Sequence, residues 1–135
     1  MALAGTAVDP DVVRLAVTLA KPHKAEIVAI HVIEVRWHLP LDAVLEAELE
    51  RGERLLSDAA QIARTEGGAL ETGVLQAREA AAAIIDDAID RGSDLIIVGM
   101  PYRRRLGQTY VGKTVQTVLV KAPCAVLAYR QEAPP

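Results

Sequence analysis

The sequence has no phenylalanine, and Trp37 is its only tryptophan. The hydrophobic residues, 51% of the chain, are mainly Ala, Val, Leu and Ile, which is typical of an α/β core in which helices pack closely on a sheet. A chain of 135 residues buries roughly two-thirds of the surface that its unfolded form exposes. We therefore expect one domain over residues 1–135, with residues 131–135 as a frayed tail.

Cysteine is also scarce: Cys124 is the only one in the sequence. It cannot form an internal disulfide, which favours a reducing, cytoplasmic location, and its apolar neighbours favour a buried structural thiol. No run reaches the roughly 18 apolar residues that span a membrane, and no basic signal-peptide region precedes the first apolar residues. We expect no direct membrane insertion. Because apolar residues follow Met1 at once, a domain cut from a longer protein stays an open alternative.

A surplus of basic residues is also absent. The net charge of −3 and the pI near 5.6 exclude a general nucleic-acid binder, which needs basic side chains to displace phosphate counterions. The only basic run is Arg103-Arg104-Arg105, with Lys113 downstream. This run is either a local anion site or a solvated loop face.

Apolar periodicity predicts strands that alternate with helices. Strands are expected at 2–4, 26–32, 70–75, 94–98 and 124–129 (Cys124 to Tyr129), and helices at 9–21, 41–66, 79–91 and 112–121. Asp9 is the expected N-cap of the first helix, and Gly52 is the expected weak point of the second. This order predicts a five-stranded parallel open sheet with helices on both faces.

Ligands of such sheets bind beyond the carboxyl ends of the strands, where the strand order reverses. The loops after the first and fourth strands, at Gly5-Thr6 and at 99–112, are therefore the expected functional region. The second loop contains GQTYVGKT (Gly107 to Thr114), which matches the phosphate-binding pattern G-x-x-x-x-G-K-[ST].

The context of GQTYVGKT does not fit a P-loop NTPase. In those enzymes the loop starts where a strand ends, but Gly107 lies eight positions beyond Gly99, where the fourth strand is expected to end. The one strand that follows contains no acid to hold Mg²⁺. What remains is Gly112-Lys113-Thr114 at the start of a helix, where free N–H groups attract anions. An ordinary first helical turn is the alternative interpretation.

The segment DLIIVG, followed by VGKTVQTVLVKAPCAVLAYR, resembles the universal stress protein family, and so does HVIEV at 31–35. Ala122-Pro123-Cys124 is the most specific local match. The resemblance covers nearly the whole chain. It implies the strand order 3-2-1-4-5 of a fold like that of adenine-nucleotide α-hydrolases.

In the ATP-binding members of this family, the loop after strand four follows G-x-x-G-x₉-G-[ST], and an aspartate ends strand one. Gly99 and Gly112 match this pattern, whereas Tyr102 replaces its second glycine, Lys113 its final Ser or Thr, and Ala4 the aspartate. The resemblance implies ATP or AMP as the ligand, with Mg²⁺ if it is ATP; a cyclic dinucleotide is a further alternative. The implied nucleotide-binding residues are Gly5, Thr6, Val32, Gly99, Tyr102, Arg103, Gly112, Lys113 and Thr114.

No catalytic or metal-binding residues are predicted. His23, His31 and His38 lack metal-ligand spacing, and no Ser-His-Asp or Cys-His arrangement is visible. Any ATP hydrolysis is expected to be slow and incidental. Two hypotheses therefore remain: a nucleotide-binding regulatory module, or a domain without a ligand that dimerises or regulates a partner, for example as the cytoplasmic part of a transporter. A homodimer is expected through the last strand, which would otherwise be an open sheet edge.

Overall fold

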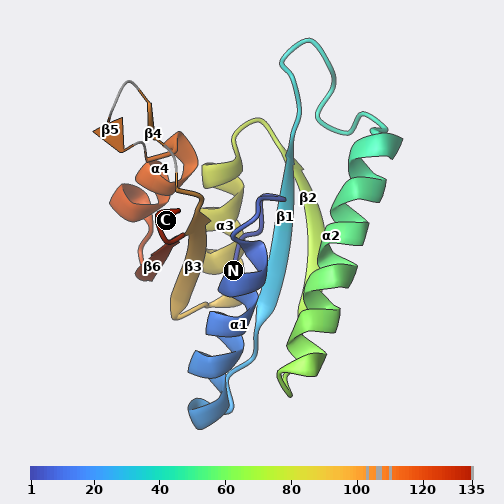
Figure 1. The fold of residues 1–135 in the computed structure, drawn as a ribbon. Helices are drawn as coiled ribbons and strands as arrows, with labels where there is room; N and C mark the ends of the chain where they lie inside the picture. Colours follow the sequence, from blue (N-terminus) through green and yellow to red (C-terminus); the bar gives the residue numbers. More distant parts are fainter. Residues whose placement is uncertain (103, 106–107, 110, 135) are drawn as a thin grey trace.

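The protein is an α/β structure in which parallel strands lie between helices (Figure 1). The structure, a computed structural model, describes residues 1–102, 104–105, 108–109 and 111–134. Strand β1 (Val28–Glu34) pairs in parallel with β2 (Glu71–Ala77), and β3 (Leu95–Met100) pairs in parallel with β6 (Ala125–Arg130). A short antiparallel hairpin follows β3, formed by β4 (Arg104–Arg105) and β5 (Gln108–Thr109).

The first residues of the chain lie between the two strand pairs. Ala2 forms parallel bridges with Ile30 of β1 and with Val98 of β3. The Ala2 N–H donates to the Ile97 carbonyl at 3.1 Å, and the Leu3 N–H donates to the Ile30 carbonyl at 2.9 Å. The α/β class is thereby confirmed, and the expected order of five strands stays a prediction.

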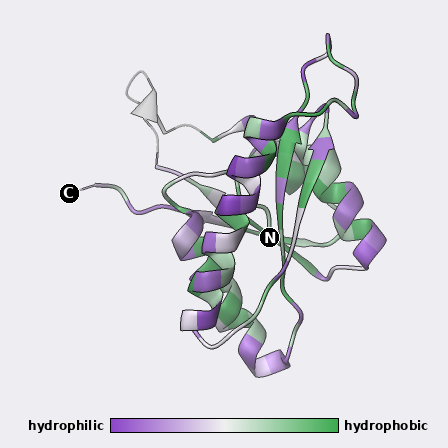
Figure 2. Cartoon of the chain, turned by 90° about the vertical axis from the view of Figure 1, so that its right-hand side faces the viewer, coloured by the Kyte–Doolittle hydropathy of each residue, from purple (hydrophilic) through white to green (hydrophobic). Residues whose placement is uncertain are grey.

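Helices cover both faces of these strands. They are α1 (Asp9–Ala20), the 3-10 turn η1 (Lys21–His23), α2 (Glu46–Thr65), α3 (Ala80–Arg91) and α4 (Lys113–Lys121). Helices α1 and α2 contact each other on one face, and α3 and α4 contact each other on the opposite face. Each helix carries hydrophilic and hydrophobic residues around its axis, whereas the strands are mostly hydrophobic (Figure 2). Within the described residues, no helix is long and apolar enough to cross a membrane.

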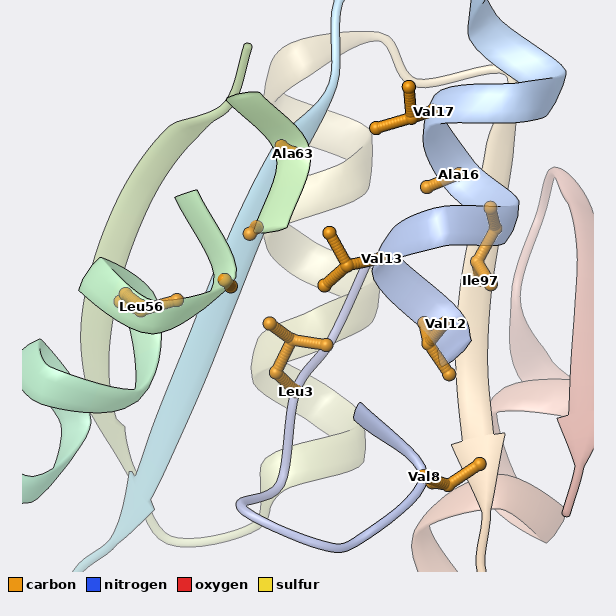
Figure 3. Packing of buried hydrophobic residues seen from close by; sticks show 11 residues of the cluster. Leu3, Val8, Val12, Val13, Ala16, Val17, Leu56, Ala63 and Ile97 are labelled. Carbon is orange, nitrogen blue, oxygen red and sulfur yellow. The ribbon is translucent and has the colours of Figure 1, made fainter. Parts of the chain in front are cut away.

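The core beneath α1 is built from small aliphatic side chains. Val8, Val12 and Val13 have no exposed surface, and Leu3 is only 2% exposed. Figure 3 shows these side chains directed toward the strands and toward α2, together with Ile97 of β3. Because none of them is aromatic, α1 can pack close to the strand backbone.

Gly99 is the point where this close packing reaches the backbone of β3. A Cβ atom at Gly99 would lie 2.8 Å from Val12 Cγ2 and 2.8 Å from Val8 Cγ1. Both valines are fully buried and β-branched, so they have little freedom to move aside. The packing of α1 is therefore sufficient to require a glycine at position 99.

The second helix is shorter than its apolar spacing predicts, because it begins at Glu46 and not at Leu41. Leu41 and Val44 are 48% and 83% exposed, so their spacing does not mark a buried face. The Gln76 side chain donates hydrogen bonds of 3.0 Å to the carbonyls of Leu41 and Ala43. These bonds hold the segment in a loop at the end of β2.

Two local predictions about helices are wrong. Val8, not Asp9, is the N-cap residue of α1, and the Asp9 carboxylate faces the preceding loop. Gly52 is not a weak point, because it is buried and a Cβ there would lie 2.9 Å from His31 Cδ2 and 3.3 Å from Val74 Cγ2. The missing side chain lets α2 approach β1 and β2.

The strands are displaced from their predicted bounds by one or two residues. β1 covers 28–34 instead of 26–32, since its register with β2 runs from Val28 opposite Glu71 to Glu34 opposite Ala77. The last strand covers 125–130 instead of 124–129, since its register with β3 places Ala125 opposite Leu95 and Arg130 opposite Met100. Cys124, half-buried and free, precedes this strand.

Replacing Gly99 by alanine tests the packing of α1 on β3. Gly99→Ala should lower the free energy of unfolding by about 1–3 kcal/mol, because the two valines must move or leave their rotamers. Gly73→Ala is the matched control: Gly73 also lies in a strand, β2, and a Cβ there meets no described atom within 4 Å. Urea unfolding measures the stability of both variants. Equal free energies of unfolding for Gly99→Ala and Gly73→Ala would contradict this packing.

Candidate functional site

The loop after the first bridged segment is closed by an acidic side chain. Gly5 adopts a left-handed φ of 81°, which favours glycine. Its N–H donates to Asp9 Oδ2 at 2.9 Å, the Thr6 hydroxyl lies 3.4 Å from Asp9 Oδ1, and the Asp9 N–H donates to the Thr6 carbonyl at 3.1 Å. Gly5, Thr6 and Asp9 therefore form one compact turn ahead of α1.

Asp9 is the residue of this turn that sequence reasoning missed as part of the site. Burial raises the pKa of its carboxyl, and hydrogen bonds from Gly5, Ala4 and Thr6 act in the opposite direction. Its position in the first turn of α1 also places a negative charge where the helix dipole favours one. Asp9-Pro10 in the sequence marks the start of a helix, and Asp9 was therefore predicted only as its N-cap residue.

The start of α4 has the properties of an anion-binding position. Gly112 is the N-cap residue and has no side chain to cap the helix, and the Gln116 N–H donates to the Gly112 carbonyl at 3.1 Å. The N–H groups of the three residues before Gln116 have no acceptor within the helix. Lys113 is exposed and Thr114 is half-buried at this end. Their main-chain N–H groups and the Lys113 charge can receive an anion.

Gly112 itself is not explained by packing. Its φ of −63° and ψ of 150° suit any residue. Among the described residues, and apart from its two chain neighbours, no atom lies within 4 Å of the position that its Cβ would take. In this respect Gly112 differs from Gly99, where α1 fills that space.

Tyr102 is held on the β6 side of the region. The guanidinium of Arg130 lies over its ring, with Cζ 5.2 Å from the ring centroid. The Tyr102 N–H donates to Gln131 Oε1 at 3.3 Å, and the Gln131 N–H donates to the Met100 carbonyl at 2.8 Å. The loop after β3 therefore begins along the end of β6.

Val32 is predicted for the site but is not brought into the loops. Val32 lies within β1, where it is paired with Leu75 of β2 and packs against the hydrophobic cluster beneath α3 and α4. Arg103 lies outside the described residues. His31 has a structural role: its Nδ1 is 2.7 Å from the Leu3 carbonyl, so it ties β1 to the first segment.

No metal centre is found in the described ranges 1–102, 104–105, 108–109 and 111–134. No three or more His, Cys, Asp or Glu side chains gather there in an arrangement that could hold a metal ion.

Comparisons with known proteins identify the family. The model of the universal stress protein family matches residues 1–130. This chain belongs to the universal stress protein family. A universal stress protein of Thermus aquaticus, encoded 3′ of a QAH/OAS sulfhydrylase, is 30% identical over 115 residues, which cover 82% of each chain.

Solved structures of universal stress proteins share the fold. A structure from Archaeoglobus fulgidus superposes with a TM-score of 0.80 at 21% identity, over 94% of this chain and 93% of that one. A second structure from the same organism, in complex with dAMP, gives a TM-score of 0.75 at 21% identity, over 94% and 92%. Two further structures of this fold contain cAMP and, in an Arabidopsis thaliana protein, AMP.

Asp9 should make the stability of the domain depend on pH. Its pKa is raised above 3.8 in the folded chain, so the folded state binds more protons between pH 3.8 and the raised value. Stability contributed in this way is complete below pH 3.8 and is lost as the pH rises through the folded pKa. Asp9→Asn removes this titration. The unfolding free energy of the variant minus that of the wild type should therefore increase from about pH 3 to pH 7.

The matched control is Asp11→Asn, which removes a 45% exposed carboxylate from the same helical turn. Urea unfolding at each pH gives the free energies. A difference for Asp9→Asn that stays constant or decreases with pH would show that burial of this carboxylate does not control its titration.

Proposed function

We propose that the domain is a small-molecule binding and regulatory module that takes an adenine nucleotide of the AMP type. The observation that carries this proposal is the start of α4, where Gly112 leaves the helix uncapped and Lys113 and Thr114 follow. A phosphate fits this position, because the N–H groups, the helix dipole and the lysine all favour negative charge. The nucleotides in solved structures of the same fold support this choice of ligand.

The order of the strands determines which loops can share one ligand. We infer a single sheet in the order 3-2-1-4-5, with the first segment of the chain as its central strand, because Ala2 bridges both β1 and β3. The order of the strands would then reverse between the Gly5-Thr6 turn and the end of β3 at Met100. This is the type of edge at which open α/β sheets bind ligands.

AMP is proposed ahead of ATP because one phosphate needs only one anion position. ATP with Mg²⁺ and cyclic dinucleotides are the ligands to compare with it. Binding, and not catalysis, is the proposed role, and any hydrolysis of ATP would be slow and incidental. A cytoplasmic location, in keeping with the single free cysteine Cys124, completes the proposal.

Replacing Lys113 tests the phosphate position. Lys113→Ala should weaken AMP binding by roughly five- to tenfold, since it removes one charged contact to phosphate, and should leave adenosine binding unchanged. Isothermal titration calorimetry with both ligands measures the two effects. Lys121→Ala is the matched control, because it removes an exposed lysine from the other end of the same helix.

The results separate the role of Lys113 from nucleotide binding itself. If the wild-type domain binds neither AMP, ATP nor a cyclic dinucleotide, the proposed function is wrong. If it binds AMP and Lys113→Ala binds equally well, the phosphate lies elsewhere.

A second candidate function is dimerisation without a ligand, as an interaction domain or as the cytoplasmic part of a larger protein such as a transporter. The observation that favours it is β6, which is paired with β3 along one edge, while within the described part of the chain no strand is paired with its other edge. Open strand edges readily pair with another chain. A second copy of this domain is the proposed partner.

Amide hydrogen exchange tests this pairing without any mutation. If two copies pair through β6, exchange of its amides should slow as protein concentration rises, because the new hydrogen bonds protect them. Strand β2, which is paired only with β1 among the described strands, is the internal control and should not change. Sedimentation velocity over the same concentrations should show a dimer. A monomer throughout, or protection that develops at β2, would contradict pairing through β6.

A further inference from the structure

The loop after β3 is fastened to the end of β6 by contacts that continue beyond the last register pair, Met100 and Arg130. We call Met100, Tyr102, Arg130 and Gln131 the Tyr102 cluster. One of its contacts extends the ladder, since the Gln131 N–H donates to the Met100 carbonyl at 2.8 Å. The others use side chains: Gln131 Oε1 accepts from the Tyr102 N–H, and the Arg130 guanidinium covers the Tyr102 ring.

These side-chain contacts depend on which residues are present. A parallel ladder forms with any non-proline residues, whereas a cation–π contact needs an aromatic ring and a cation. Tyr102 and Gln131 are both half-buried, whereas Arg130 is exposed, so the cation–π contact lies at the surface. The Tyr102 side chain is thus given a defined place at the end of β6.

One hydrophobic cluster connects this place with the proposed phosphate position. Met100, two residues before Tyr102, and Val111, the residue before Gly112, both pack against the hydrophobic cluster beneath α3 and α4. Among the described residues, and apart from its two chain neighbours, no atom lies within 4 Å of the Cβ position of Gly112. A tyrosine ring released from β6 could enter this space.

We propose that Arg130 and Gln131 are positioning residues of the nucleotide site. They hold the Tyr102 ring on β6 and thereby keep the start of α4 open to the phosphate of the ligand. This inference rests on the proposed function, because it concerns the phosphate position at Gly112 and Lys113. Neither Arg130 nor Gln131 contacts the ligand itself.

The test measures AMP and adenosine affinity by calorimetry in Arg130→Ala, Gln131→Ala and Tyr102→Gly, and in Tyr102→Gly combined with Arg130→Ala. Arg130→Ala and Gln131→Ala should each weaken AMP binding by about two- to fivefold, the factor that corresponds to an exposed cation–π contact or one hydrogen bond. Adenosine affinity should not change. The ratio of the two affinities is independent of the folded fraction, so a general loss of stability would not imitate this result.

The double variant separates positioning from direct contact. In the Tyr102→Gly background the obstructing ring is absent, so Arg130→Ala should have no further effect on AMP affinity. Arg78→Ala is the matched control, because Arg78 also lies over an aromatic ring, Trp37, with Cζ 5.0 Å from its centroid. It should leave the AMP to adenosine ratio unchanged.

Four results would overturn the inference. An equal loss of AMP affinity from Arg130→Ala in both backgrounds would mean that Arg130 contacts the phosphate. Equal losses for AMP and adenosine would mean that the cluster acts only through stability. A wild-type domain that binds AMP, with Arg130→Ala and Gln131→Ala at full AMP affinity, would refute the inference but not the proposed function. A wild-type domain that binds no nucleotide would refute both.

Discussion

The backbone hydrogen bonds of the first segment are the contacts on which the rest of the structure depends. Through Ala2 and Leu3 the chain joins β1 to β3, so the two strand pairs are tied together by main-chain atoms. Such bonds satisfy the main-chain groups of a segment that is shielded from water on both sides. Helices on both faces provide this shielding, and Leu3 is 2% exposed beneath α1 and α2. His31 adds a side-chain bond to the same segment.

Shielding a strand from both sides demands close helix packing, and the composition meets this demand. A core without phenylalanine is filled by valine, alanine, leucine and isoleucine, which let the helices approach the strands. Glycines mark the nearest approaches, at Gly99 beneath Val8 and Val12 and at Gly52 against His31. The scarcity of aromatics is therefore a condition of the packing, and the same packing holds the turn ahead of α1 beside the end of β3.

Periodicity and local chemistry predicted the helices and strands well where the relevant contacts are local. Helix α4 begins and ends where the sequence indicated, because Gly112 and Ala122-Pro123 are local signals. Errors arose where distant residues decide. Gln76 keeps Leu41 and Ala43 out of α2, and the ladder with β3 determines where β6 begins. The same holds for the candidate site: Gly112, Lys113 and Thr114 were predicted from a pattern, whereas the partners of Tyr102 lie at the carboxyl end of β6.

The two loops at the candidate site differ in electrostatic character. The Gly5-Thr6 turn already holds a carboxylate, since Asp9 accepts hydrogen bonds from this turn. A second anion there would meet like charge and would find the Gly5 N–H already engaged. The start of α4 has the opposite character, with N–H groups that lack intrahelical acceptors and an exposed lysine. A ligand that reaches both loops must therefore carry its negative charge at one end and hydrogen-bond donors at the other, as a nucleoside monophosphate does.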